Sequence, residues 1–140
     1  SRLVVRPERA SASTRVLTLR PVRDPERHLR PLVELFLQGR CQPLLFFPET
    51  SLAYVLAAPP DAPPYQQRRA VRSARDAWRD TWEGPPGEGS DPYVRRVFGE
   101  AEPFAADFAW EGEALRPGLD FHSLAHRVWG PLLDHVSGLR

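Results

Sequence analysis

The chain has 140 residues, a length that suits one domain or part of a larger protein, and 41% of them are hydrophobic, enough to build a core. The formal net charge is +1, so the charge balance alone calls for neither a nucleic acid nor a membrane surface as a partner. No apolar run approaches the roughly 18 residues of a membrane-spanning helix. The single cysteine, Cys41, excludes an internal disulfide, fits a reducing cytoplasm and is interpreted as a buried structural thiol.

All 19 positively charged side chains are arginines, because the sequence contains no lysine. Isoleucine, asparagine and methionine are also absent. The codons for these four residues begin with AA or AT, so a GC-rich genome explains the bias more simply than a selection for arginine chemistry. The abundance of arginine is therefore not taken as evidence for DNA binding.

The N-terminal part of the chain is expected to contain two strands followed by a helix. Short β-type runs at Leu3–Val5 and Val16–Leu19 predict a hairpin or two neighbouring strands. Apolar residues at helical spacing predict a helix over His28–Gln38, with Pro31 in its first turn and Gly39 at its end.

Two helices are expected in the middle of the chain. The first is short, Leu52–Ala57, and Thr50 or Ser51 is positioned to cap it. The second covers Tyr65–Trp82. Its apolar stripe, expected to face the core, consists of Ala70, Val71, Ala74, Ala77, Trp78 and Trp82.

Two further helices are expected towards the C-terminus. Asp91 and Pro92 are a typical N-cap and first helical residue, so they predict a brief helix over Tyr93–Phe98. A 3.6-residue period predicts the last helix over Asp120–Val136, with a kink or restart at Gly130-Pro131. The stretch between these helices is poorly patterned and is expected to be anchored by Phe104, Phe108 and Trp110.

Three segments in this order carry a family resemblance: PLLFFPETS at Pro43–Ser51, GEGSDPY at Gly87–Tyr93 and LAHRVWGPLLDH at Leu124–His135. Together they resemble the C-terminal domain of RecC, the gamma subunit of bacterial exonuclease V (RecBCD), over about Leu29 to His135. The residues that mark the resemblance as structural motifs are Phe46, Phe47, Pro48, Asp91, Pro92, Tyr93, Trp129, Gly130 and Pro131.

The resemblance implies an α/β fold, namely the C-terminal part of a catalytically degenerate PD-(D/E)xK nuclease-like domain that is helix-rich with a few short strands. Residues 1–140 would then be a RecC-like C-terminal domain, and the lack of an initiator Met suggests a piece of a longer chain. The implied function is a non-catalytic scaffold and strand-guiding part of an ATP-dependent helicase–nuclease in recombinational repair of double-strand breaks. The implied partners are RecB-like and RecD-like subunits and double- and single-stranded DNA, in the cytoplasm and without a membrane.

The residues themselves argue against catalysis by this part of the protein. A (D/E)xK nuclease motif and a P-loop both require lysine, and the sequence contains none. His122 and His126 are four residues apart, a spacing that can bind metal, but the pattern lacks the glutamate of HExxH and a third ligand in view. They are therefore interpreted as packing or surface residues. No catalytic residue, metal site or cofactor is predicted; the competing hypotheses are a generic protein–protein interaction module and an active metal-dependent nuclease.

Five arginines on the predicted helix Tyr65–Trp82 are the candidate contact residues. They could neutralise DNA phosphates, contact a partner protein or form a solvent-exposed face, and the sequence leaves these three alternatives open. Family members often have lysine where this chain has Glu49, which makes a phosphate-binding role for FFPETS doubtful but leaves a packing role untouched. The candidate residues are Arg68, Arg69, Arg72, Arg75 and Arg79.

Overall fold

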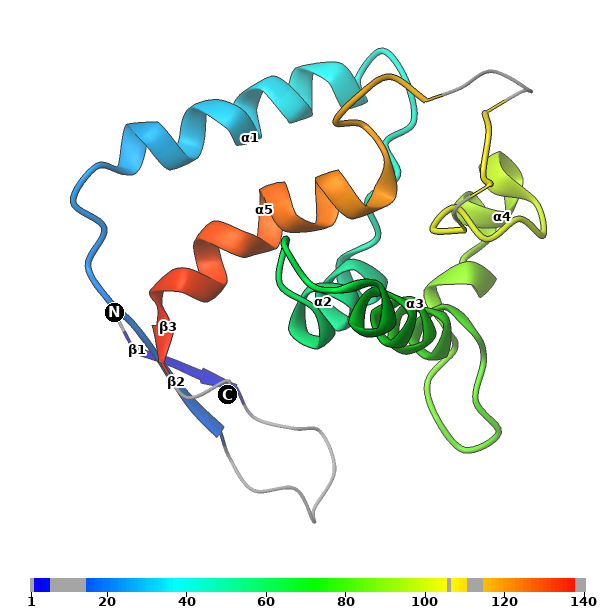
Figure 1. Ribbon diagram of the computed structural model, residues 1–140, viewed down its shortest axis with the longest axis horizontal. Coiled ribbons are helices and arrows are strands. Elements are labelled where there is room, and N and C mark those ends of the chain that lie inside the picture. The colour runs from blue at the N-terminus through cyan, green and yellow to red at the C-terminus, as the bar shows by residue number, and fades with distance from the viewer. Residues whose placement is uncertain (1, 6–14, 106, 111–114, 138–140) are drawn as a thin grey trace.

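The computed structural model describes residues 2–5, 15–105, 107–110 and 115–137 (Figure 1). Five α-helices form the body of this described part, and a small sheet lies at the end of α5 that is remote from α4. The helices are α1 (Pro25–Gly39), α2 (Pro48–Ala57), α3 (Pro64–Trp78), α4 (Pro92–Phe98) and α5 (Phe121–His135), with a 3-10 turn, η1, at Glu88–Ser90.

The sheet has three antiparallel strands in the order β1 (Arg2–Val5), β2 (Arg15–Leu19) and β3 (Val136–Ser137). The predicted neighbouring strands are therefore confirmed, with Val4 opposite Val16. β3 was not predicted, because it has only two residues and continues directly from α5. Its pairing with β2 joins the end of the described chain to the beginning.

α1 begins three residues earlier than predicted because Asp24 and Pro25 form its start. The Arg27 N–H donates to Asp24 Oδ1 at 3.3 Å, and Pro25 occupies the first turn, where its missing N–H costs nothing. Pro31 consequently lies inside the helix rather than in its first turn.

α2 and α3 also differ from the prediction, α2 at its start and α3 mainly at its end. α2 begins at Pro48, so Thr50 and Ser51 are buried inside it and do not act as its N-cap. α3 ends at Trp78, because Arg79 is extended. Trp82 therefore lies beyond the helix and is fully exposed, which contradicts its predicted place in the core.

The two C-terminal helices agree with the sequence patterns. Asp91 accepts hydrogen bonds from the N–H groups of Tyr93 (2.8 Å) and Val94 (3.2 Å), so it is the N-cap of α4. α5 continues through Pro131 without the restart that Gly130-Pro131 suggested. Of the expected anchors, Phe104 is buried, while Phe108 and Trp110 are half-buried and their rings contact Phe98.

The core lies between α2, α3 and α5. Small residues on α3 and at the end of α2 let these helices approach closely, and aromatic rings fill the remaining space. α1 lies alongside α5 on the opposite side from α3 and contributes only Leu35 to the core (Figure 1). The other buried hydrophobic residues are Leu45, Phe47, Tyr54, Ala58, Ala62, Ala70, Ala74, Trp78, Phe104, Phe121, Leu124 and Ala125.

The predicted α/β nuclease-like architecture is wrong for this chain. Within the described residues the core is made of helices packed on helices, and the strands of four, five and two residues form a marginal antiparallel sheet. A nuclease-like α/β domain would need a central sheet covered by helices. The prediction depended on the family resemblance, whereas the residues themselves showed only two short β-type runs.

Candidate functional site

The three sequence motifs meet at the N-terminus of α2. Glu88, from GEGSDPY, accepts hydrogen bonds from the N–H groups of Glu49 (3.0 Å) and Thr50 (2.7 Å) in FFPETS. The first N–H groups of a helix have no partner within the helix, and a carboxylate there also interacts favourably with the helix dipole. Ser51 Oγ accepts from the Phe47 N–H at 3.2 Å. Glu88 therefore acts as the cap of α2 from a distant loop.

The third motif reaches the same point through Trp129 on α5. Its indole Nε1 donates to the Pro48 carbonyl oxygen at 3.1 Å, and its ring centroid lies 6.5 Å from that of Phe46. Phe47 points into the core, where its ring contacts Trp78. These contacts give the motif residues structural roles in joining α2 to the rest of the fold.

Two positions of GEGSDPY require glycine, because the backbone of this loop lies very close to the end of α3. A Cβ on Gly87 would lie 2.4 Å from the Trp78 carbonyl oxygen, and one on Gly89 would lie 2.5 Å from Trp78 Nε1. The Gly87 N–H also donates to Asp80 Oδ1 at 2.8 Å. Hydrogen bonds from the Ser90 side chain and from this N–H lower the pKa of Asp80. The loop is thus fixed against α3 while Glu88 points to α2.

The predicted arginines divide into two groups on α3. Arg68, Arg72 and Arg75 lie on one helix face and line the same groove, whereas Arg69 is exposed outside it. Arg75 makes a bidentate ion pair with Glu102 (Nε–Oε1 2.9 Å, Nη2–Oε2 2.8 Å).

Arg79 also binds Glu102, through Nη2 and Oε1 at 2.9 Å. Two of the five candidates are therefore partly neutralised, while Arg68, Arg69 and Arg72 form no ion pair with any residue that the structure describes.

The groove lies between α3 and α5 and has a volume of about 900 Å³. Basic and polar side chains from α3 form one wall, side chains from α5 form the other, and Tyr54 and Phe104 contribute buried rings. Asp107 is the only carboxylate on its described lining, so positive charge predominates. The other lining residues are Pro60, Pro64, Gln67, Arg68, Val71, Arg72, Arg75, Ala105, His122, Ser123 and His126.

His122 and His126 come from the α5 wall of this groove. Both rings pack on Tyr54, with centroid distances of 4.7 Å and 5.6 Å, which agrees with the predicted packing role. Each Nδ1 is buried and lacks a hydrogen-bond partner among the described residues. Burial lowers the pKa of both imidazoles, with the neighbouring Asp120 carboxylate opposing the shift at His122 and the charge of His122 adding to it at His126.

Two ionisable groups next to these histidines, Asp120 and Tyr54, have shifted pKa values. Asp120 caps α5 by accepting from the Ser123 N–H at 2.9 Å and its hydroxyl at 2.7 Å. Burial opposes ionisation of Asp120, but these hydrogen bonds keep its pKa below the usual value. Burial, with a smaller contribution from the Asp120 charge, raises the pKa of Tyr54, so this phenol stays neutral.

The described residues include no group of three or more His, Cys, Asp or Glu side chains that could hold a metal ion. The pair His122 and His126 thus has no third protein ligand nearby in that part of the chain. Cys41 is exposed, which contradicts its predicted burial.

A stripe of apolar residues on α1 faces solvent, and we call it the α1 stripe: Leu29, Val33, Phe36 and Leu37. These positions recur at i, i+4, i+7 and i+8, so they share one helix face. Phe36 is 66% exposed, and the other three are more than half exposed. Exposed apolar patches of this kind are typical of protein interaction surfaces.

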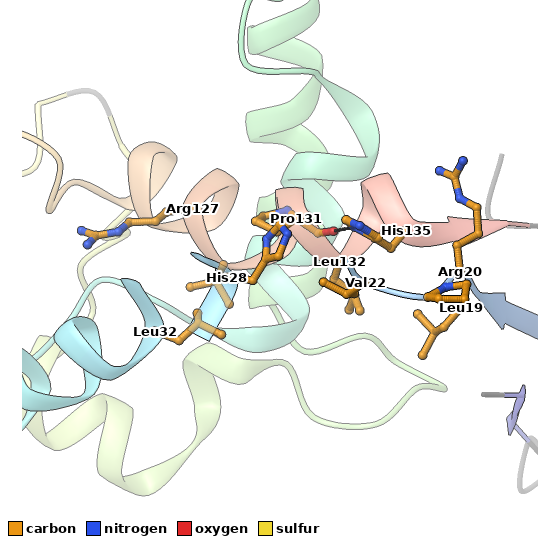
Figure 2. Close-up of a pocket in the computed structure, with 11 residues that line it drawn as sticks. Leu19, Arg20, Val22, His28, Leu32, Arg127, Pro131, Leu132 and His135 are labelled. Carbon is orange, nitrogen blue, oxygen red and sulfur yellow. Dashed lines mark hydrogen bonds between the residues drawn. The ribbon is translucent and has the colours of Figure 1, made fainter. Parts of the chain in front are cut away.

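A cavity of about 390 Å³ lies beside this stripe, between α1, α5 and the segment after β2 (Figure 2). Its lining is mostly apolar, and His28 meets His135 edge to face at 5.3 Å between ring centroids. Its two arginines lie at opposite ends in Figure 2, and both already have partners: Arg127 binds Glu34 and Arg20 donates to the Asp134 carbonyl oxygen. The cavity therefore has a mostly apolar lining and, among its described residues, no unpaired arginine.

The model of the family described as the RecC C-terminal domain matches residues 4–59 of the chain. This segment is related to the RecC C-terminal domain. The predicted resemblance to this family is thereby confirmed over this segment, which contains the first of the three motifs. No curated protein and no solved structure matches the chain.

The RecC-related segment includes β2, α1 and α2, and thus both FFPETS and the α1 stripe. The α3 arginines, GEGSDPY and Trp129 lie outside it. In the part of the chain that the structure describes, no helix combines the length and apolar character needed to cross a membrane.

We expect Glu102→Gln to lower the free energy of unfolding by roughly 1 kcal/mol at neutral pH, because the partly exposed Arg75 and Arg79 lose their shared carboxylate. The Arg75 hydrogen bond lowers the pKa of Glu102, with the charges of Arg75 and Arg79 adding to this and burial opposing it. The stabilisation is therefore present above about pH 4.3, the unfolded pKa of Glu, and is lost as pH falls through the lower folded pKa. Urea denaturation at neutral and acidic pH should show the difference between the two proteins shrinking in acid.

Glu100→Gln is the control, because Glu100 pairs with Arg95 in a more exposed setting. It should change stability by less than about 0.5 kcal/mol. A loss that is equal in the two variants, or independent of pH, would contradict the role given to Glu102.

Proposed function

We propose that this chain is a non-catalytic scaffold and strand-guiding part of an ATP-dependent helicase–nuclease complex of the RecBCD type, acting in recombinational repair of double-strand breaks. The observation that supports this most directly is the match of residues 4–59 to the RecC C-terminal domain. We further propose that residues 1–140 form one RecC-like domain and that it works in the cytoplasm. The absence of lysine supports the non-catalytic role, since neither a (D/E)xK motif nor a P-loop can be formed.

The α1 stripe supports a docking role. This helix leaves five large apolar residues exposed, the four of the stripe and Leu32, and contributes only Leu35 to the core, so it has more apolar surface than its own domain uses. Interfaces bury such residues at their centres and leave arginine and other polar residues at the rim. We propose that this stripe contacts a RecB-like or RecD-like subunit.

The groove between α3 and α5 supports a role in guiding strands. Arg68 and Arg72 lie at this surface without an ion-pair partner among the described residues, so their charges are free to meet phosphates. The buried rings and the helix caps around them hold the groove walls in place.

The test is co-purification with RecB-like and RecD-like subunits, comparing the wild-type chain with a Leu29→Glu/Phe36→Glu double variant. Because both residues are exposed, the substitutions should change the free energy of unfolding by less than about 1 kcal/mol in total. At an interface, two buried carboxylates should weaken binding by at least about tenfold.

Leu56→Glu/Val97→Glu is the matched control, because these residues are also exposed and apolar but lie on α2 and α4. The control should co-purify like the wild type. A wild-type chain that remains monomeric beside both subunits would refute the assembly role, and equal binding by both double variants would refute the α1 stripe as the docking surface.

A further inference from the structure

We infer that the groove between α3 and α5 binds the phosphodiester backbone of single-stranded DNA, and that His122 and His126 take up protons as a phosphate enters. This inference rests on the proposed function, since it names the ligand class and the regulation of the strand-guiding surface. It adds the histidines to a surface for which the sequence suggested only arginines.

Arginines form one wall of the site. Arg68 and Arg72 are separated by one helical turn on the same face of α3, and both line the groove. Neither is paired with a carboxylate in the described part of the chain, whereas Arg75 beside them is held by Glu102. Unpaired guanidiniums on one helix face can bind successive phosphates of a strand, because each phosphate accepts charge-assisted hydrogen bonds.

Tyr65 favours a nucleic acid over an acidic peptide. It precedes Arg68 and Arg72 by three and seven residues, so it shares their helix face, and its side chain is 68% exposed. An exposed aromatic ring in line with guanidiniums provides a stacking surface for a nucleobase, which a carboxylate-rich peptide would not use.

The histidines face this row from α5. Their unpartnered Nδ1 atoms are buried polar groups, and such groups cost free energy until they find a partner. The other charged or titratable groups around them are Tyr54 from α2, Asp107 from the loop, Asp120 at the start of α5, and the arginines of α3.

These surroundings keep the imidazoles neutral in the free chain. Burial disfavours the charged form of both imidazoles; Asp120 opposes this effect at His122, and the charge of His122 adds to it at His126. A phosphate in the groove neutralises the guanidiniums and adds a negative charge, so it favours protonated imidazoles. Binding should therefore strengthen as pH falls.

The experiment is a fluorescence-polarisation titration of the chain with a short labelled oligothymidylate, at fixed ionic strength, between about pH 5.5 and 8. Affinity is expected to rise on acidification by up to about tenfold per pH unit for each proton taken up. His126→Gln should reduce this pH dependence. Arg68→Ala/Arg72→Ala should weaken binding at every pH and lower the salt slope by about 0.7 for each lost phosphate contact.

Arg23→Ala/Arg27→Ala is the matched control, because it removes two exposed arginines, one just before α1 and one in its first turn, and changes the net charge equally. It should bind like the wild type. If His126→Gln fails to fold in a thermal melt, NMR titration of the wild-type histidine Cε1 protons gives the same information. Two histidine pKa values should then rise when oligothymidylate is added.

Four outcomes would overturn the inference. Binding that is independent of pH, or histidine pKa values that do not move, would remove the histidines from the site. If both arginine double variants weakened oligonucleotide binding equally, the groove would not be the specific DNA contact. Displacement of the oligonucleotide by a polyglutamate peptide at equal concentration would assign the groove to an acidic protein segment. No binding even at low salt would reject the groove as a DNA site but leave the assembly test, which depends on α1, unaffected.

Discussion

Replacing Phe47 with alanine is expected to lower the free energy of unfolding by about 3–5 kcal/mol, the usual cost of removing a buried aromatic ring. The side chain is 4% exposed, and its ring lies 4.8 Å from that of Trp78, 5.4 Å from Phe98 and 6.5 Å from Phe121. The substitution would therefore leave a cavity where residues from three separate helices meet. Urea denaturation followed by far-ultraviolet circular dichroism measures the loss.

The adjacent Phe46 provides the control. It is only half-buried and its nearest ring partner is Trp129 at 6.5 Å, so Phe46→Ala should cost roughly 1–2 kcal/mol. If Phe46→Ala were as destabilising as Phe47→Ala, the core would not be centred on Phe47.

Gly87→Ala is expected to destabilise the fold by about 1–3 kcal/mol or more. The new methyl group would lie 2.4 Å from the Trp78 carbonyl oxygen and 2.5 Å from the backbone of Arg79, so the loop or the end of α3 must move. Such a movement would also shift Glu88 away from the N-terminus of α2. Thermal and urea denaturation should both report the loss.

Gly130→Ala is the matched control and should have the opposite sign. Nothing lies within 4 Å of a Cβ at Gly130, which is inside α5, so alanine should stabilise the helix by up to about 1 kcal/mol. Equal destabilisation by the two substitutions would show that the close approach at Gly87 is not what makes a glycine necessary there.

The sequence predicted the helices well where local signals define them. Asp91-Pro92 marked the start of α4, and the apolar period of α5 gave its extent to within one residue at each end. Local signals gave the wrong N-cap for α2, because the residue that caps this helix is distant in the sequence. Thr50 and Ser51 were plausible caps by sequence, but the carboxylate that caps α2 belongs to Glu88, which no rule based on nearby residues could identify.

The candidate site was predicted only in part. The arginines were visible in the sequence, but their division was not, because the Glu102 that neutralises Arg75 and Arg79 lies in a stretch without a pattern. Trp82 was assigned to the core because it continued the apolar stripe of α3, yet the helix ends four residues earlier. The fold class was wrong because it was taken from the resemblance, and a resemblance in motifs does not fix the number or arrangement of strands.

Because Glu88 caps α2 from a distant loop, α2 cannot be separated from the later part of the chain without losing this cap. The match to the family model ends at residue 59, but α2 obtains its cap from Glu88 and its Pro48 contact from Trp129, both far beyond that point. A polypeptide cut at residue 59 would contain α2 without the partners that fix its first turn, and with the Phe47 side chain uncovered. The family match therefore ends inside a set of segments that contact one another, and a truncated fragment should be tested for aggregation before any activity is assigned to it.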